Sequence, residues 1–143
     1  MNPADDLLRI VIGANALTRI ASTETRNEAP AAQWRTLSLL RTHGPQRVGD
    51  LASLSRVTQP GMTRLVGQLA EEGLVARSSD PADSRAIVVS ITDTGARALE
   101  GWLDLLRSSW EPRLAQLDDA DRAALARTAA LLERVAAPQG VAR

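Results

Sequence analysis

The sequence predicts a mainly α-helical protein with one small β-hairpin, and two observations carry that prediction. First, apolar residues through most of the chain recur at intervals of three and four, the spacing of one helix face. Second, the segment from Gln46 to Gly95 has the pattern of two helices joined by a tight turn and followed by two short strands. A length of 143 residues, with 44% hydrophobic and 24% charged residues, suits a single globular domain over residues 1–143.

The composition excludes several kinds of site. The chain has no cysteine, which removes disulfides, thiolate catalysis and cysteine-based redox sensing. Its one histidine, His43, leaves no histidine cluster for zinc, and we find no nucleophile and base that could act together. We therefore expect no enzyme activity, no catalytic residue, no metal and no cofactor. No stretch approaches the ~20 apolar residues that span a bilayer, and no secretory signal is visible, so we expect a cytoplasmic protein without membrane contact.

A first helix is predicted over residues 4–26. Its apolar side chains form two adjacent strips, the first made by Leu7, Ile10, Val11, Ala14 and Leu17 and the second by Leu8 and Ile12. A helix that is apolar on two faces in a small domain packs both on its own core and on a partner subunit. The alternative is a deeply buried core helix in a monomer.

A second helix is predicted from Pro30 to Thr42, after a polar loop that ends at Ala29. Trp34, Leu37 and Leu40 share one face, so we interpret Trp34 first as a core residue. The pair Gly44-Pro45 ends this helix.

The next helix is predicted from Val48 to Leu54, with Leu51, Ala52 and Leu54 facing inward. Arg47 precedes it in the N-cap position. Arginine caps a helix poorly, but its guanidinium could reach a phosphate.

A turn follows over residues 55–57. After it, Thr58 is predicted to cap the next helix, the second of the two joined by this turn, which ends at Gly73. One face of this helix is apolar, made by Met62, Leu65, Val66 and Leu69. The opposite face carries Gln59, Gly61, Thr63, Arg64 and Gln68, with no acidic residue before Glu71. A polar face without carboxylates is what a helix facing DNA needs.

The charge distribution is compatible with a nucleic-acid partner without demanding one. The formal net charge is zero, and residues 35–92 carry 7 arginines against 5 acids, a balance of +2. Because the net charge is small, the arginines would have to cluster on one face to attract a nucleic acid. The absence of lysine suits bidentate contacts to phosphate and guanine, although a coding bias explains it as well.

Two strands are predicted next, Leu74–Arg77 and Ala86–Ile91, joined by a turn-rich loop from Ser78 to Arg85. Arg85 is expected near the tip of this hairpin, with Asp83 placed to hold its guanidinium. Arginine suits a narrow minor groove, where the negative potential is strongest.

A long helix capped by Thr92 or Thr94 is predicted to reach about Leu117, kinked at Pro112. Its apolar seam comprises Leu99, Leu103, Leu106, Trp110, Leu114 and Leu117. Asp118 begins a last helix whose inner face is expected to comprise Leu125, Thr128, Leu132 and Val135, and a frayed tail follows from Pro138.

Five motifs mark this order of elements: Leu51-Ala-x-Leu54, Met62-Thr-Arg-Leu-Val66, Leu69-x-x-x-Gly73-Leu-Val75, Arg77-x-x-Asp80-Pro-x-Asp-x-Arg85 and Ile91-Thr-x-x-Gly95. Together they resemble the MarR (multiple-antibiotic-resistance regulator) family. The resemblance covers nearly the whole chain in element order. It implies a winged helix-turn-helix lobe over residues 30–92, flanked by dimerisation helices over residues 4–26 and 93–137.

The resemblance also implies a function. Members of this family are homodimers that bind pseudo-palindromic double-stranded DNA, usually repress nearby genes, and release the DNA when a small, often aromatic ligand binds. By position, the resemblance assigns the major groove to Thr58, Gln59, Pro60, Gly61, Thr63 and Arg64. It assigns the minor groove to Arg85, positioned by Asp83, and backbone or wing-supporting contacts to Arg47, Arg56 and Arg77. Since the chain has no Tyr or Phe, the aromatic walls of a ligand pocket would be Trp34 and Trp102, or Trp110.

Two departures from the family pattern modify these expectations. Ser84 stands where many members carry a second basic residue, which weakens the expected wing contact. Pro60 and Gly61 leave few long side chains at the tip of the reading helix and shift base readout to Gln59, Thr63 and Arg64. The alternative function is a protein-interaction module that keeps the winged-helix fold without specific DNA binding.

Overall fold

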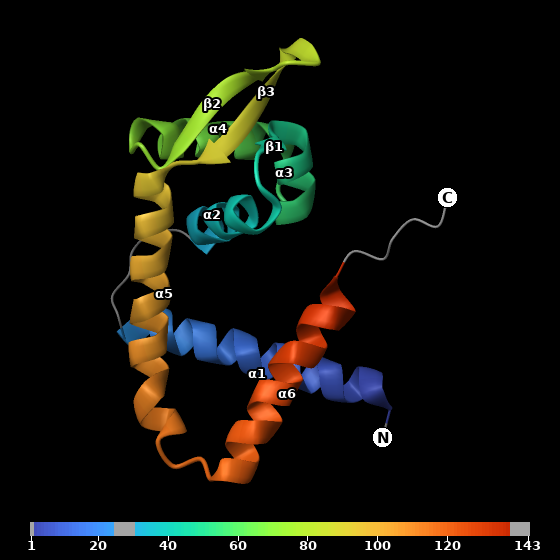
Figure 1. Cartoon of the computed structure of the whole chain (residues 1–143), viewed down its shortest axis with the longest axis vertical. Coiled ribbons are helices and arrows are strands. Elements are labelled where there is room, and N and C mark those ends of the chain that lie inside the picture. The colour runs from blue at the N-terminus through green and yellow to red at the C-terminus, as the bar shows by residue number, and fades with distance from the viewer. Residues whose placement is uncertain (1, 25–30, 138–143) are drawn as a thin grey trace. The chain divides into compact units, whose positions relative to one another are not determined.

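The computed structural model describes residues 2–24 and 31–137 (Figure 1). The expected mainly helical class with a small sheet is confirmed, and the boundaries are α1 Pro3–Glu24, α2 Ala31–His43, β1 Gln46–Arg47, α3 Val48–Ser55, α4 Gln59–Glu71, β2 Val75–Asp80, β3 Asp83–Ile91, α5 Asp93–Leu114 and α6 Asp119–Ala136. The chain divides into two compact units, Met1–Ser109 and Trp110–Arg143, which are described separately. The expected helix start at Pro30 and the tail from Pro138 lie outside the described residues.

The sheet has three antiparallel strands in the order β1-β3-β2. The short strand β1 pairs Gln46 with Val89 and Arg47 with Val88, so the chain segment before α3 joins the base of the hairpin. The hairpin itself is longer than expected. The prediction of a loop from Ser78 to Arg85 is wrong, because β2 continues to Asp80 and β3 begins at Asp83.

Backbone pairing explains this error. The inner end of the hairpin is anchored in the core by Val75 and Val89, and cross-strand backbone hydrogen bonds extend it outward although the side chains there are polar. The polar residues that suggested a loop therefore lie in strands, and only residues 81–82 form the turn. The register shifts once: Ser79 pairs with Ile87 while Asp80 pairs with Asp83, which leaves residues 84–86 as a bulge on β3.

The core of the first unit lies between α2, α3, α4, the sheet and the start of α5. Its fully buried members include Leu37, Leu40, Leu51, Met62, Val66, Leu69, Val89 and Leu99. Leu54 was expected to face inward, but its side chain is 45% exposed and Ser55 is buried instead. At about 3.6 residues per turn, the buried stripe of α3 passes through Leu51, Ala52 and Ser55 and leaves Leu54 to one side.

The junction between the hairpin and α5 is organised by Thr92. Its hydroxyl donates to the Gly73 carbonyl at 2.6 Å and accepts the Gly95 backbone N–H at 3.0 Å. The Thr92 backbone N–H donates to the Leu74 carbonyl at 3.1 Å. Thr92, rather than Thr94, is therefore the residue that caps the long helix.

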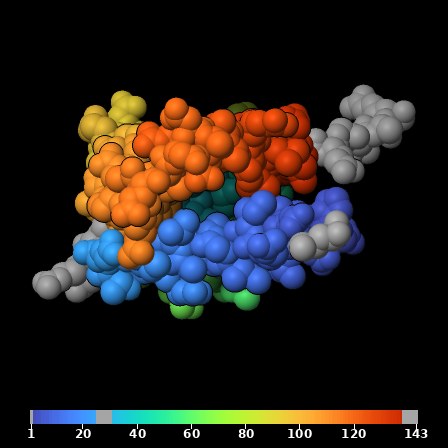
Figure 2. Space-filling view, turned by 90° about the horizontal axis from the view of Figure 1, so that it is seen from below, coloured from blue at the N-terminus to red at the C-terminus, as the bar shows by residue number. Residues whose placement is uncertain are grey.

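Helix α1 is not a deeply buried core helix. Ala21 is its buried residue, and the side chains of Leu8, Val11 and Ile12 are each about half exposed or more. Its surface forms a continuous blue band on the face seen in Figure 2. In a single copy of the chain, α1 thus presents apolar surface that the core does not cover.

In the second unit, α5 ends at Leu114, slightly before the predicted limit at Leu117, with Pro112 inside its last turn. Asp118 caps α6 as expected, since its carboxylate accepts the Asp121 backbone N–H at 2.8 Å. No residue of α6 is buried. Within the described ranges, no helix is both long and apolar enough to cross a bilayer.

Candidate nucleic-acid interface

Helix α4 is held by caps at both ends. Thr58 Oγ1 accepts the Gly61 backbone N–H at 3.1 Å at its start. At its end, Gly73 has φ +75° and the Leu74 N–H donates to the Leu69 carbonyl at 2.9 Å, a Schellman motif that glycine favours. The apolar face of the helix packs into the core. Its opposite face is therefore presented outward, with Gln59, Thr63 and Arg64 exposed.

The turn before α4 is tight. Arg56 is the C-cap of α3 with φ 55°, the left-handed region, and among the described residues it is the one non-glycine with positive φ. The Val57 N–H donates to the Ala52 carbonyl at 3.1 Å and closes the turn. The backbone strain is modest for a single residue, and the Arg56 side chain is exposed.

A cleft of about 490 Å³ lies between the helix-turn-helix and the hairpin. Three arginines from the three strands line it, Arg47 from β1, Arg77 from β2 and Arg85 from β3. Gln59 and Thr63 of α4 line the same cleft, as does Asp50. The structure thus brings five of the sequence-predicted DNA-contact residues to one concave surface.

The other predicted contacts are not among the side chains that line this cleft. Thr58 is the N-cap of α4, Pro60 and Gly61 lie in its first turn, and Arg56 lies in the preceding turn. Arg64 lies on the outer face of α4. These residues belong to the exposed end and face of the reading helix rather than to the space beside the hairpin.

Arg47 is engaged by the carboxylate of Asp80, a contact that the sequence did not predict. Its Nε and Nη2 lie 2.7 and 2.6 Å from Asp80 Oδ2. Asp80 Oδ1 accepts the Ala82 backbone N–H at 2.8 Å. The Ala82 N–H and then the Arg47 guanidinium hold the pKa of Asp80 below its usual range, and Asp80 raises the pKa of Arg47.

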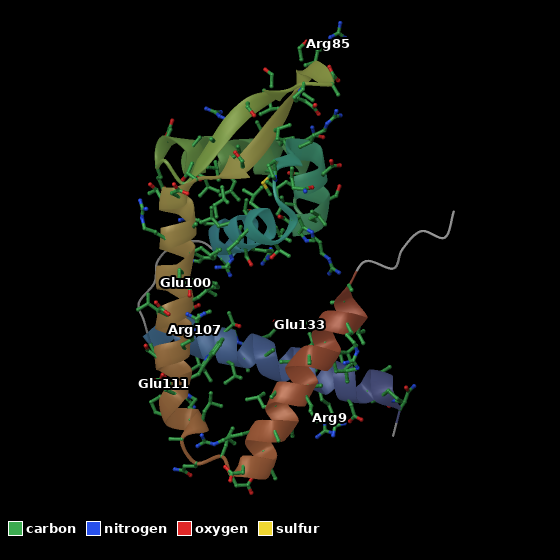
Figure 3. The ribbon with its side chains drawn as sticks, viewed as in Figure 1. Arg9, Arg85, Glu100, Arg107, Glu111 and Glu133 are labelled. Atoms are coloured by element: carbon green, nitrogen blue, oxygen red, sulfur yellow. The ribbon has the colours of Figure 1, made fainter. Side chains whose placement is uncertain are left out.

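The expected role of Asp83 needs correction. Its carboxylate accepts the backbone N–H of Arg85 at 3.0 Å, and no ion pair joins it to the Arg85 guanidinium among the described residues. The two-residue spacing suits an Asx-type contact to the backbone rather than to the side chain. Arg85 itself lies at the outer end of the hairpin, as expected, and Figure 3 shows its side chain pointing away from the strands.

A second pocket, of about 530 Å³, contains the two tryptophans predicted for a ligand site. Trp34 of α2 stacks on Trp102 of α5 with ring centroids 5.4 Å apart and planes 8° apart. The pocket is lined by Thr18, Ser22, Ala31, Trp34, Arg35, Ser38, Leu39 and Trp102. Both rings are only partly buried, so they pack against the core and also line the pocket. Trp110, the third candidate, belongs to the other unit.

Arg35 connects this pocket to the helix-turn-helix. It lines the pocket, and its Nη1 donates to the backbone carbonyl of Ser55 at 3.4 Å. Ser55 is the last residue of α3, directly before the tight turn. The same side chain therefore borders both the pocket and the turn that orients α4.

A charge network joins α2 to α5. Glu100 accepts from Arg41 at 3.0 Å and from Arg107 at 2.8 Å (Figure 3 shows Glu100 and Arg107 on α5). The two guanidinium groups, Arg107 first, lower the pKa of Glu100. All three side chains are about half exposed, so this network contributes little to stability by itself.

Comparison with known proteins agrees with this geometry. Residues 30–87, which span the reading helix and most of the hairpin, match the model of the MarR family. A helix-turn-helix transcriptional regulator of Mycobacterium tuberculosis is 34% identical over 107 residues, which cover 62% of this chain and 75% of that protein. The transcriptional repressor NicR of Pseudomonas putida is 32% identical over 93 residues, 65% of this chain and 59% of NicR.

Solved structures share the fold. The apo form of MarR from E. coli superposes with a TM-score of 0.73 at 23% identity, covering 95% of this chain and 98% of that one. A transcriptional regulator from Thermotoga maritima gives a TM-score of 0.70 at 25% identity, covering 93% of each chain. The chain belongs to the MarR family and is a DNA-binding transcriptional regulator of the helix-turn-helix class.

Proposed function

We propose that this protein is a homodimeric repressor that binds a pseudo-palindromic operator and is released by a small aromatic ligand. The observation that carries the DNA-binding part is the outward face of α4, which has no acidic residue before Glu71 and stands beside a hairpin that carries Arg85 near its outer end. The proposed partner is genomic DNA, so the proposed location is the cytoplasm. The proposed repressor role follows from the relative NicR, which is a transcriptional repressor.

In this proposal α4 enters the major groove and the hairpin follows the adjacent minor groove. Gln59, Thr63 and Arg64 read base edges, because their side chains are exposed on the outer face of α4. The start of α4, with its N-cap Thr58 and with Pro60 and Gly61 of its first turn, approaches the DNA closely, and Arg56 and Arg77 contact phosphates. Arg85 enters the minor groove, where a guanidinium is favoured.

The proposed dimer rests on the apolar surface of α1. Six of its apolar side chains are between 38% and 60% exposed, namely Leu7, Leu8, Ile10, Val11, Ile12 and Leu17. A second copy of the chain would cover them, with α5 and α6 contributing as the sequence predicts. A two-fold dimer places the two copies of α4 about one helical turn apart on the DNA, roughly 10 bp.

The proposed ligand site is the pocket with Trp34 and Trp102. Stacked indole rings suit a flat aromatic molecule. Release would act through Arg35, since a ligand that draws its guanidinium into the pocket removes the hydrogen bond to the Ser55 carbonyl. The turn between α3 and α4 would then lose one of its supports.

DNA binding is tested by comparing the parent, Arg64→Ala and Arg85→Ala in electrophoretic shift assays on the DNA upstream of the gene and on scrambled DNA. Arg64→Ala should lose discrimination between the two DNAs by about 1–3 kcal/mol, the worth of one good base contact. Arg85→Ala should weaken binding to both. The control is Arg97→Ala, which removes an exposed arginine of α5 that does not line the cleft.

Two outcomes would overturn the assignment. Equal binding of parent, Arg64→Ala and Arg85→Ala would remove these side chains from the interface. Binding that does not weaken as salt rises would favour the protein-interaction alternative, because phosphate contacts release counterions.

A further inference from the structure

The ion pair between Arg47 and Asp80 joins two segments that lie 33 residues apart in the sequence. Arg47 belongs to β1, directly before the first helix of the helix-turn-helix, and Asp80 is the last residue of β2 before the hairpin turn. The contact therefore connects the helix-turn-helix to the outer part of the hairpin.

The geometry of this pair differs from that of an ordinary surface ion pair. Two nitrogens of Arg47 converge on Asp80 Oδ2, at 2.7 and 2.6 Å. The other carboxylate oxygen accepts the Ala82 N–H of the turn at 2.8 Å. The Asp80 side chain is only 16% exposed. The carboxylate is thus held from the hairpin turn on one side and from β1 on the other.

The outer hairpin has few other connections to the helix-turn-helix. The backbone pairing of β1 reaches only Val88 and Val89, near the inner end of β3. Beyond that point lies the bulge over residues 84–86, which interrupts the pairing of β2 with β3. Among the described residues, Arg47 to Asp80 is the one side-chain hydrogen bond or ion pair that leaves residues 78–87 for another element. Arg85 sits in that bulge.

We propose that Asp80 is a positioning residue for DNA binding and that Arg47 acts with it as a latch on the hairpin, rather than mainly as a phosphate contact. The latch holds the outer hairpin against β1 at an angle from which Arg85 reaches the minor groove. This inference rests on the proposed placement of Arg85 in the DNA. It gives Asp80 a role and changes the role that the sequence predicts for Arg47.

Simple electrostatics and the latch predict opposite changes in DNA affinity when the charge of Asp80 is removed. Removing an acidic residue beside DNA lowers repulsion of the phosphates and should strengthen binding. If Asp80 positions the hairpin, removing its charge should weaken binding instead. Asp50 provides the matched control, because it lines the same cleft.

The first experiment measures operator affinity for Asp80→Asn, Arg85→Ala and the double variant in otherwise full-length protein. Asp80→Asn should bind about tenfold more weakly than the parent, a loss of ~1.4 kcal/mol. In the Arg85→Ala background the same change should have little effect, because the latch acts through Arg85. Asp50→Asn should bind as tightly as the parent or more tightly. The latch would be overturned if Asp80→Asn bound the operator at least as tightly as the parent. It would also be overturned if the double variant lost the sum of the binding free energies that the two single variants lose.

The second experiment needs no DNA, so its result is separate from that of the proposed function. The chain has no cysteine, and Ser84→Cys therefore gives a single site for a nitroxide label in the bulge. Adding Asp80→Asn or Arg47→Ala should sharpen the electron paramagnetic resonance lines of this label, whereas a label at Gln68→Cys on α4 should not change. Unchanged lines at Ser84→Cys would overturn the latch even if the parent binds its operator. If Asp80→Asn or Arg47→Ala sharpened the lines but the parent protein bound no DNA, the latch would stand and the proposed function would be removed.

Discussion

Gly95 shows how one residue can determine a junction between elements. It is buried in the first turn of α5, and its N–H donates to Thr92 Oγ1. A Cβ built on it would overlap the backbone carbonyl of Leu74, which itself accepts the Thr92 N–H. The motif Ile91-Thr-x-x-Gly95 therefore has a physical reason: the threonine caps the helix, and the glycine lets the chain at Leu74 approach it.

We expect Gly95→Ala to destabilise the fold by about 3 kcal/mol, the upper part of the range for overpacking, because backbone rather than a flexible side chain would have to move. Gly101→Ala on the same helix is the control. A Cβ built at Gly101 meets no atom within 4 Å beyond its chain neighbours and the nearby backbone of its own helix, so this change should be neutral or stabilise the helix by up to ~1 kcal/mol. Urea unfolding at one fixed protein concentration measures both. Similar stability of the two variants would contradict the steric argument.

At the scale of elements, α4 combines a structural cap with a reading surface, and the two threonines near its start separate these roles. Thr58 Oγ1 accepts the Gly61 N–H, whereas Thr63 Oγ1 donates to the Gln59 carbonyl one turn back. Thr58 thus satisfies a backbone donor that nothing inside the helix can reach. Thr63 only adds a second donor to a carbonyl of the helix itself.

Thr58→Ala should therefore cost about 1 kcal/mol of unfolding free energy, the usual worth of an N-cap. Thr63→Ala should leave stability nearly unchanged and reduce operator affinity. Thermal unfolding and shift assays on both variants test the split. If Thr63→Ala lost more stability than Thr58→Ala, the assignment of cap and contact would be wrong.

The hairpin shows that residue composition alone can predict the wrong element. Residues 78–85 are rich in serine, aspartate and proline, which favoured a loop. The strands nevertheless extend through most of this segment, because each backbone finds its partner across the hairpin. Where both faces of a hairpin are exposed to solvent, the strand preference of each residue has little weight. Backbone pairing between the strands then decides how far the strands extend.

At the scale of the whole molecule, the exposed apolar residues of α1 lead to a prediction about association. Leu8 and Ile12 are 59% and 60% exposed, so changing either should not disturb the monomer. Leu8→Glu and Ile12→Glu should shift the protein from dimer to monomer in sedimentation velocity at micromolar concentration, since each would place an unpaired charge in an apolar interface. Operator affinity should fall in parallel, because one half-site binds less tightly than two.

Arg9→Gln is the control and should remain a dimer, because the Arg9 side chain is 72% exposed and lies across the helix from these apolar strips. A parent that sediments as a monomer would contradict the proposed dimer directly. Glutamate variants that sediment like a dimeric parent would place the interface elsewhere than on α1.

The sequence by itself determined the order of the elements and the outward face of α4. Helical spacing, the Thr58 cap and the glycine at position 73 are local signals, because a helix is made by contacts between residues three and four apart. The conformations of Gly73 and Thr58 in the structure follow those signals. The family motifs are local in the same sense and could be identified in one chain.

The tertiary structure alone decided the contacts that join distant segments. Asp80 meets Arg47 across 33 residues, and Trp34 meets Trp102 because α2 packs against α5. Leu54 faces solvent because the direction of the core, not its own apolar side chain, selects the buried stripe of α3. Such pairings depend on how the elements pack in three dimensions, and no periodicity within a single element encodes them.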